Sequence, residues 1–162
     1  MRASMACLAP RFSSVRMLQE YVERAYLPAA ASFRRRAARQ NGVSESLERW
    51  SRHLARHWPA VRFGEATART NGRQVTVSVP VYLGEIERDS VRVELFANPE
   101  EGDAPLRQQM TPVEAIANVP NASIYRATID TARPAGDFTA RVVPYHPDAR
   151  VPIECPLIAW QR

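Results

Sequence analysis

The hydrophobic pattern of this 162-residue chain changes its period near residue 60, and this change constrains the fold more than any other feature. Before it, apolar residues recur three or four positions apart, as they do on one face of a helix. After it, apolar and polar residues alternate, as they do on a strand with one buried face. The sequence therefore predicts a mainly β chain with an α-helical N-terminal segment, divided into residues 1–60 and 61–162.

The first predicted helix begins at Ser13 or Ser14, because either hydroxyl can accept a hydrogen bond from a free backbone N–H group. Pro28 should end or redirect it, since the residue before a proline avoids the helical region. The apolar residues at helical spacing form one stripe, with Tyr21 beside it: Val15, Leu18, Val22 and Tyr26.

Two further helices are predicted before residue 60. The second covers Ala29 to Gln40 and stops at Asn41-Gly42. The third begins after Ser44 or Ser46 and is closed by Pro59. Its stripe is expected to be a packing face, with a sugar-stacking platform as the alternative: Leu47, Trp50, Leu54 and Trp58.

Residues 61–162 predict six or seven short strands separated by regular turns. Asn71-Gly72, between two strand-like runs, is a strong hairpin signal. Residues 97–107 read as a polar loop, and Pro112 and Pro120 bracket an irregular stretch. The runs that alternate centre on Val77, Val93, Ala127 and Ala140, and a last apolar piece covers Leu157 to Trp160. The expected fold is an antiparallel, immunoglobulin-like β-sandwich, without the Cys…Trp…Cys core of antibody domains.

The basic residues of the chain are 22 arginines, and it contains no lysine. A pyridoxal phosphate Schiff base with a lysine is therefore excluded. The six glycines are scattered, so no phosphate-binding glycine-rich loop is expected. The net charge is +5, with a cluster at Arg34, Arg35, Arg36 and Arg39 that predicts a solvated helix face or a contact with an acidic domain. Nothing resembles a nucleic-acid motif.

The histidines and cysteines are the candidates for metal or redox sites. His53 and His57 lie four residues apart on the third helix and could reach one metal ion, but Leu54 stands where a zincin helix has Glu. The remaining histidine, His146, falls in a β loop. Cys7 and Cys155 have no metal-ligand spacing, so we expect buried or idle thiols and no metal site, with a disulfide between the two ends of the chain as the alternative.

Two acidic clusters and a set of aromatic residues complete the candidates. Paired carboxylates can serve glycoside hydrolysis, but those in loops are more often solvated. The clusters are Glu85, Glu87 and Asp89, and Glu100, Glu101 and Asp103. The aromatic residues could stack on sugar rings or pack in the core: Tyr82, Tyr125, Tyr145 and Trp160. We predict no catalytic, cofactor-binding or metal-binding residue.

The N-terminus and the hydropathy favour a cytoplasmic location. Residues 1–16 contain Arg2, Arg11 and Arg16 and no acid, as a transit peptide does, but the helical interpretation is preferred. No run approaches the length of a membrane span. The sequon Asn121-Ala122-Ser123 then has no meaning as a glycosylation site.

Two stretches in a fixed order resemble the ends of bacterial α-glucan (glycogen or maltodextrin) phosphorylases of the glycosyltransferase-B type. The first is FSSVRMLQEYVERAYLP, from Phe12 to Pro28, and the second runs from Gly136 to Trp160. Between them, VYLGEIERDSVRVELF is similar to a β segment of the same family. Arg16, Glu20 and Tyr21 match the family pattern and are expected to be domain-contact residues.

The resemblance implies phosphorolysis of α-1,4-glucan to glucose 1-phosphate by a full-length enzyme that uses pyridoxal phosphate. None of the family's cofactor, phosphate or sugar motifs matches a position here, so the implied role is a non-catalytic C-terminal portion, with most of the enzyme upstream of Met1. The expected partners are the parent's catalytic domains, α-glucan or a second copy of the chain. The alternative is a stand-alone carbohydrate-binding or protein-interaction β-sandwich module.

Overall fold

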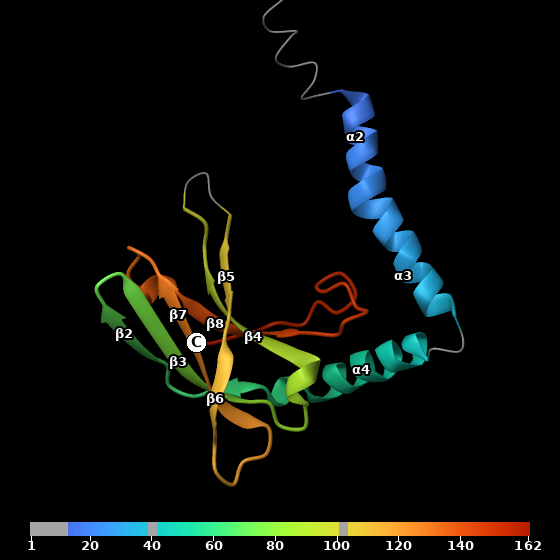
Figure 1. Cartoon of the computed structure of the whole chain (residues 1–162). Helices are drawn as coiled ribbons and strands as arrows, with labels where there is room; N and C mark the ends of the chain where they lie inside the picture. The colour runs from blue at the N-terminus through green and yellow to red at the C-terminus, as the bar shows by residue number, and fades with distance from the viewer. Residues whose placement is uncertain (1–12, 39–41, 101–103) are drawn as a thin grey trace, which may run out of the picture. The chain divides into compact units, whose positions relative to one another are not determined.

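The computed structural model describes residues 13–38, 42–100 and 104–162 of the chain (Figure 1). They form two compact units that divide between Ser46 and Leu47. The units divide before the change of sequence period near residue 60, because the helix α4 (Val43–His57) packs Trp50 and Leu54 into the core of the β unit. The assignment of residues 1–60 and 61–162 to separate domains stays a prediction.

The first unit contains the helical segments α2 (Ser14–Tyr21), η1 (Val22–Tyr26) and α3 (Leu27–Ala37), drawn in Figure 1 as a continuous coil. Ser13 has extended backbone, and its side chain accepts a hydrogen bond from the backbone N–H of Arg16 at 3.4 Å. This is the N-cap that the sequence predicted.

Pro28 does not end the helix, so that part of the prediction was wrong, whereas a redirection of the helix stays a prediction. A proline inside a helix lacks a donor for the carbonyl four residues earlier and clashes with it. Here η1, the turn before Pro28, is a π-helical turn in which the N–H of Leu27 donates to the carbonyl of Val22. Pro28 itself falls in the first turn of α3. The wider turn allows the chain to stay helical past the proline.

The end of α3 and the start of α4 differ from the predicted positions. α3 ends at Ala37, and the predicted end at Gln40 and Asn41 lies outside the described residues. α4 begins at Val43, before the predicted serine caps, and the hydroxyl of Ser44 donates to the carbonyl of Arg36. α4 ends at His57, and Pro59 lies in the 3₁₀ turn η3 (Trp58–Ala60), as expected.

The second unit contains two antiparallel sheets. The order of the first is β1-β3-β7-β6, and β2 also pairs with β3. Its strands are β1 (Arg62–Phe63), β2 (Thr67–Asn71), β3 (Gln74–Tyr82), β6 (Thr111–Ala115) and β7 (Ala122–Asp130). The order of the second sheet is β5-β4-β8-β9. Its strands are β4 (Val91–Ala97), β5 (Leu106–Gln109), β8 (Thr139–Pro144) and β9 (Ala159–Trp160).

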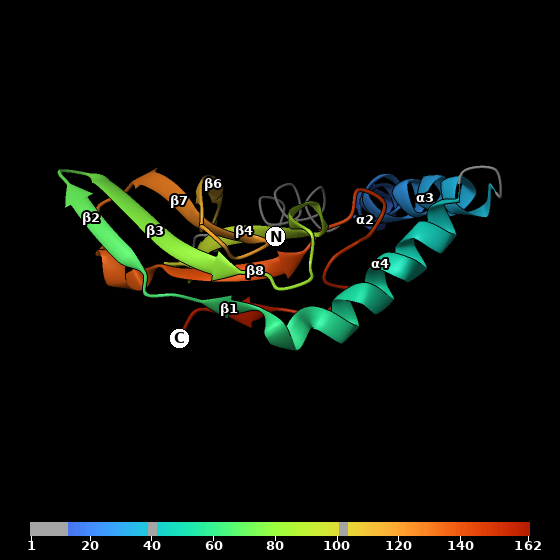
Figure 2. The same ribbon diagram turned by 90° about the horizontal axis from the view of Figure 1, so that it is seen from below.

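Alternation along the long strands builds one core that both sheets share. Every second residue of β3 and β4 is buried, beginning with Val75 and Val91. α4 adds Trp50 and Leu54 to the same cluster, and Trp58 follows from η3, so the predicted packing face is confirmed. Figure 2 shows α4 leading through η3 into β1. The mainly β fold with antiparallel sheets is confirmed, whereas the immunoglobulin-like class stays a prediction.

The predicted hairpin joins β2 and β3. Asn71 pairs with Gln74, so the two-residue loop is Gly72-Arg73, one position later than the signal suggested. Gly72 has a φ of 59°, which glycine adopts without strain. A glycine at the first loop position is the requirement of a type II′ turn, which matches the twist of the flanking strands.

Three further details differ from the predicted strands. The described residues contain β1 to β9 rather than six or seven strands, because the two-residue strands β1 and β9 carry no periodic signal. The predicted loop 97–107 is shorter, since Leu106 and Arg107 belong to β5. Pro112 lies in β6, an edge strand with an irregular register at that point, where a missing donor is tolerated. Among the described residues, no helix is long and apolar enough to cross a membrane.

Candidate functional site

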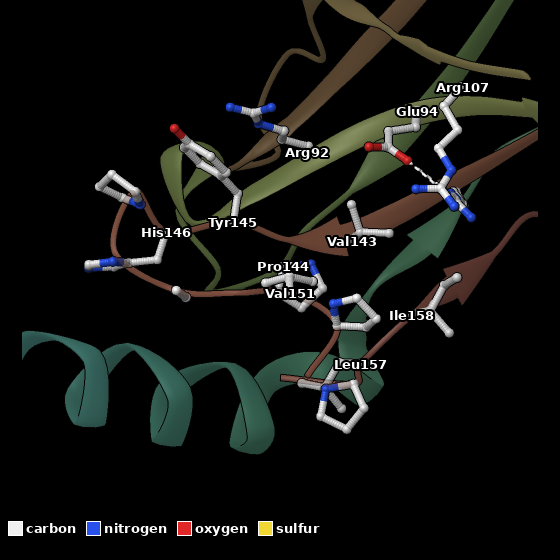
Figure 3. Close-up of a pocket in the computed structure, with 15 residues that line it drawn as sticks. Arg92, Glu94, Arg107, Val143, Pro144, Tyr145, His146, Val151, Leu157 and Ile158 are labelled. Atoms are coloured by element: carbon white, nitrogen blue, oxygen red, sulfur yellow. Dashed lines mark hydrogen bonds and ion pairs between the residues drawn. The ribbon is translucent and has the colours of Figure 1, made fainter. Parts of the chain in front are cut away.

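The candidate site is a pocket of about 520 Å³ on the outer face of the second sheet (Figure 3). Arg92, Glu94 and Arg141 come from alternating positions of β4 and β8, whose other side chains fill the core, and Arg107 comes from β5. After β8 the chain passes through Tyr145 and returns to Ile158 before β9, and this segment forms the opposite wall. The volume falls in the range of ligand-binding pockets.

An ion pair between neighbouring strands occupies the sheet side of the pocket. Glu94 and Arg141 are register partners on β4 and β8. Arg141 donates from Nε at 3.0 Å and from Nη2 at 2.7 Å to the same oxygen, Oε2 of Glu94. Both side chains are largely covered, with exposed fractions of 11% for Arg141 and 20% for Glu94. Such charge-assisted bonds are among the strong hydrogen bonds of proteins.

Aromatic rings hold Arg141 in place. Its guanidinium carbon lies 4.5 Å from the ring centroid of Phe96 and 5.3 Å from that of Trp160. The two rings meet edge to face at 5.3 Å. The contacts are favourable because the faces of aromatic rings attract cations. The result is a cation whose charge is neutralised by Glu94 and whose position is fixed.

Two other arginines line the pocket without a carboxylate partner in the described part of the chain. Arg92 stacks on the ring of Tyr145, with its guanidinium carbon 3.7 Å from the centroid. Arg107 extends from β5 and is exposed. Glu94, the acidic residue that lines the pocket with them, is bound to Arg141. The pocket therefore carries an uncompensated positive charge.

The remaining wall is apolar. Figure 3 shows Val143 on the sheet side and Val151 and Leu157 on the returning segment. Four prolines also line it: Pro144, Pro147, Pro152 and Pro156. An apolar wall with a few fixed cations suits the binding of a ligand. Glu94, Arg141, Arg92 and Tyr145 already contact one another through ion pairing and stacking.

His53 and His57 do come together on α4. Their ring centroids are 4.5 Å apart. Nε2 of His53 lies 3.1 Å from the carbonyl oxygen of Glu85, and Nδ1 of His57 lies 3.4 Å from the Glu85 carboxylate. No group of three or more potential metal ligands occurs in the described residues. The ring of the third histidine, His146, lies tilted against that of Trp50, with the centroids 5.4 Å apart.

The acidic clusters are dispersed among separate contacts. Glu85 faces the histidines, whereas Glu100 pairs with Arg133 at 3.3 Å. Asp89 lies in the 3₁₀ turn η4 (Arg88–Ser90), and Glu87 is the residue that precedes this turn. Glu101 and Asp103 lie outside the described residues.

The four aromatic residues do not share one surface. Tyr125 is buried in the core, and burial raises the pKa of its hydroxyl. Tyr82 belongs to β3 in the first sheet, whereas Trp160 belongs to β9 in the second sheet and Tyr145 lines the pocket on that sheet. Arg92 covers one face of Tyr145, and Trp160 is 40% exposed.

The remaining sequence candidates have structural contacts. Cys155 is buried, with the pKa of its thiol raised by that burial, and Cys7 lies outside the described residues. The sequon Asn121 donates from Nδ2 to the carbonyl of Gly84 at 3.1 Å. In the arginine cluster, Arg34 and Arg35 are exposed on α3, and Arg39 is outside the described residues.

Sequence reasoning named Tyr145 and His146 as candidates but missed the charged residues that line the pocket. Arg92, Glu94 and Arg141 occupy the polar positions of alternating strands, so a signal for an outward-facing charged row was present. Their convergence depends on the pairing of β4 with β8 and on the return of the chain after Tyr145, which have no local signal.

The fold and the pocket together define an antiparallel β domain with a pocket on the outer face of one sheet. Residues 58–162 match the family described as the glycogen phosphorylase C-terminal domain, and the chain belongs to this family. The resemblance inferred from the sequence is thereby confirmed.

Known phosphorylases match a longer part of the chain, including the helical region. The chain is 29% identical, over 157 residues, to the glycogen phosphorylases of Mycobacterium bovis (strain ATCC BAA-935 / AF2122/97) and Mycobacterium tuberculosis (strains CDC 1551 / Oshkosh and ATCC 25618 / H37Rv). The match covers 90% of this chain. The chain spans only 18% of the length of these relatives.

Proposed function

We propose that the chain is a non-catalytic accessory portion of an α-glucan phosphorylase and that its helical unit binds the catalytic portion of that enzyme. The parent reaction would be phosphorolysis of α-1,4-glucan to glucose 1-phosphate in the cytoplasm. The proposal is supported by the family match and by the relatives, which are named glycogen phosphorylases and of which this chain matches 18%. One observation on the helical unit supports its proposed binding to the catalytic portion.

That observation is an exposed apolar stripe along α2 and η1. The exposed fractions are 72% for Val15, 61% for Leu18 and 62% for Tyr26. Tyr21, beside the stripe, is 56% exposed, and no residue of α2, η1 or α3 is buried. A contiguous apolar surface of this kind marks an interaction site. A helix of this composition gains most of its stability from burying such a face, so a covering partner is required.

The polar side of the same helix is internally paired. Glu20 lies 3.6 Å from Nε of Arg16 and 3.9 Å from Nη1 of Arg24. These exposed pairs contribute little to stability. They neutralise these charges along the helix, so the apolar stripe is the surface left for a partner. Arg16 and Glu20 lie at its border.

Pyridoxal phosphate, which phosphorylases of the resembled family use, does not fit this chain. A Schiff base needs a lysine amine, and the sequence has none. We therefore assign the cofactor and the chemistry to the rest of the phosphorylase. The chain alone should release no glucose 1-phosphate from maltodextrin and phosphate with the cofactor added.

The docking role is tested by mixing the chain with a phosphorylase that lacks its matching C-terminal region, such as that of Mycobacterium tuberculosis. Sedimentation velocity should show a complex. Leu18→Asp with Tyr26→Asp should abolish it, because both changes place charge on the stripe. The matched control is Arg24→Gln, on the polar side of the same helix, which should leave the complex intact. Loss of the complex in both variants, or in neither, would refute the docking role.

Self-association through the stripe is the second use of the same surface, and a concentration series in the same instrument distinguishes it. A net charge of +5 on each copy opposes it at low salt. Binding of α-glucan has less support, because the aromatic candidates are divided between the core and the two sheets. Retardation of the chain in native gels that contain glycogen would support glucan binding.

A further inference from the structure

The pocket between β4, β8 and the Tyr145–Ile158 segment presents cations that nothing else in the described chain neutralises. We propose that it binds an extended segment of another protein in which two carboxylates lie four residues apart with an apolar side chain between them. The proposal goes beyond the proposed function, because it concerns a different surface of the chain from the helical stripe.

The charge of the pocket sets the chemistry of the partner. Arg92 and Arg107 have no carboxylate within ion-pair distance in the described residues, and Glu94 is bound to Arg141 through two hydrogen bonds. The guanidinium of Arg92 is fixed by the ring of Tyr145, which holds the cation without removing its charge. Fixed guanidinium groups are well suited to carboxylates, because their donors match both oxygens.

The strand register sets the spacing of the carboxylates. Arg107 pairs with Phe96, which lies four residues beyond Arg92 on β4. Four residues of strand span about 13 Å. An extended peptide has the same rise per residue, so its residues i and i+4 are separated by the same distance. They also project to the same side as residue i+2.

The apolar wall supplies the contact for the residue between the two acids. Val143, Val151 and Leu157 line the pocket. Ile158, which also lines the pocket, is 41% exposed. Exposed apolar side chains around a pocket favour a partner larger than a small anion, because a small ligand would leave them in water.

A second copy of the chain is a poor occupant. Each copy has a net charge of +5, so the partner of a basic pocket should be an acidic polypeptide of another kind. Phosphate and small dicarboxylates share the charge of such a segment but lack its apolar residue, and they serve as competitors in the test.

The test is an NMR titration of the full chain with the peptide acetyl-Asp-Thr-Leu-Thr-Asp-amide. Signals of Arg92, Arg107 and Tyr145 should shift together, and raising the salt from about 50 to 300 mM should weaken binding several-fold. The matched peptide with Asn in both acidic places should bind at least about tenfold more weakly, since it lacks both charge-assisted contacts.

Variants of the chain decide whether the pocket is responsible. Arg107→Gln, at an exposed position, and Arg92→Gln should each weaken the Asp peptide about five- to tenfold. Arg69→Gln, a change that is also exposed but lies on β2 in the other sheet, should have no effect. Thermal unfolding checks each variant, and if Arg92→Gln fails to fold, Arg107→Gln decides alone.

Three results would overturn the proposal. The Asp and Asn peptides could bind equally, which would remove the role of charge. Arg69→Gln could weaken binding as much as Arg107→Gln, which would indicate a diffuse electrostatic effect. Citrate could bind as tightly as the Asp peptide, which would identify the pocket as a small-anion site.

Discussion

Arg141 and Glu94 face each other across β8 and β4, and two donors of the guanidinium meet a single carboxylate oxygen, Oε2. The pair lies on the outer face of its sheet and is nevertheless mostly covered, because Phe96 and Trp160 pack against the guanidinium. It joins strands that are distant in the sequence. It also consumes the carboxylate that would otherwise neutralise the pocket.

Glu94→Gln should lower the free energy of unfolding by about 2 kcal/mol. The change leaves the guanidinium of Arg141 covered and without its counter-charge, and removing one partner of a covered pair is more costly than the pair's net contribution. Urea unfolding followed by tryptophan fluorescence measures the loss. Asp130→Asn is the control, because its 3.0 Å pair with Arg73 is exposed, with fractions of 70% and 73%. That change should cost less than about 1 kcal/mol, and equal losses would contradict the role of burial.

Leu54→Ala should lower the free energy of unfolding by about 3 kcal/mol. Leu54 has no exposed surface and packs from α4 into the core of the β unit, so the change removes apolar contacts and leaves a cavity. Arg56→Ala, an exposed change on the same helix, should be nearly neutral and controls for helix propensity. A small effect of Leu54→Ala would show that α4 is not held by the core.

Much of the β unit could be predicted because alternation is a local signal. Val77 and Val93 each mark a strand in which every second residue is buried, and Gly72 marks the hairpin. Burial of one sheet face forces this pattern on each strand separately. The two-residue strands β1 and β9 were missed, since so short a segment cannot show a period.

The predictions failed where a local sequence rule was overridden by an irregular turn or by contacts between segments distant in the sequence. Pro28 normally ends a helix, but the π-helical turn before it accommodates the ring. Pro112 suggested irregular structure, yet it is tolerated in the edge strand β6. The pocket required knowing that Arg92 and Tyr145 would stack, which follows from the pairing of β4 and β8 and not from the residues near either one.

Gly72→Ala should destabilise the chain by about 1 kcal/mol. The φ of Gly72 is 59°, and a side-chain carbon there would meet no atom within 4 Å, so the cost is conformational and not steric. Gly136→Ala is the matched control, because its site is equally open and its φ lies outside the left-handed region. It should change stability by less than about 0.5 kcal/mol. Similar losses in both variants, measured by urea unfolding, would rule out the backbone explanation.

Cys155 should make stability fall at high pH. Burial raises the pKa of its thiol above the ordinary value of 9.0, so the folded state keeps this proton longer than the unfolded state does. Stability from this group is therefore complete below about pH 9 and is lost as the pH rises through the folded pKa. Tyr125 has a raised pKa for the same reason and adds a loss with the same sign from about pH 10, so the contribution of Cys155 must be taken as a difference.

The measurement compares Cys7→Ser with the double variant Cys7→Ser, Cys155→Ala, which differ only in the buried thiol. Unfolding free energies from urea titrations at pH 8 to 10 should fall more steeply in the variant that keeps Cys155. In that variant, iodoacetamide should modify Cys155 far more slowly in the folded state at pH 8 than in guanidinium chloride, since the thiolate is the reactive form and the folded thiol is covered. Identical pH slopes in the two variants, together with rapid alkylation of the folded chain, would mean that the thiol is accessible and ionises as it does in water.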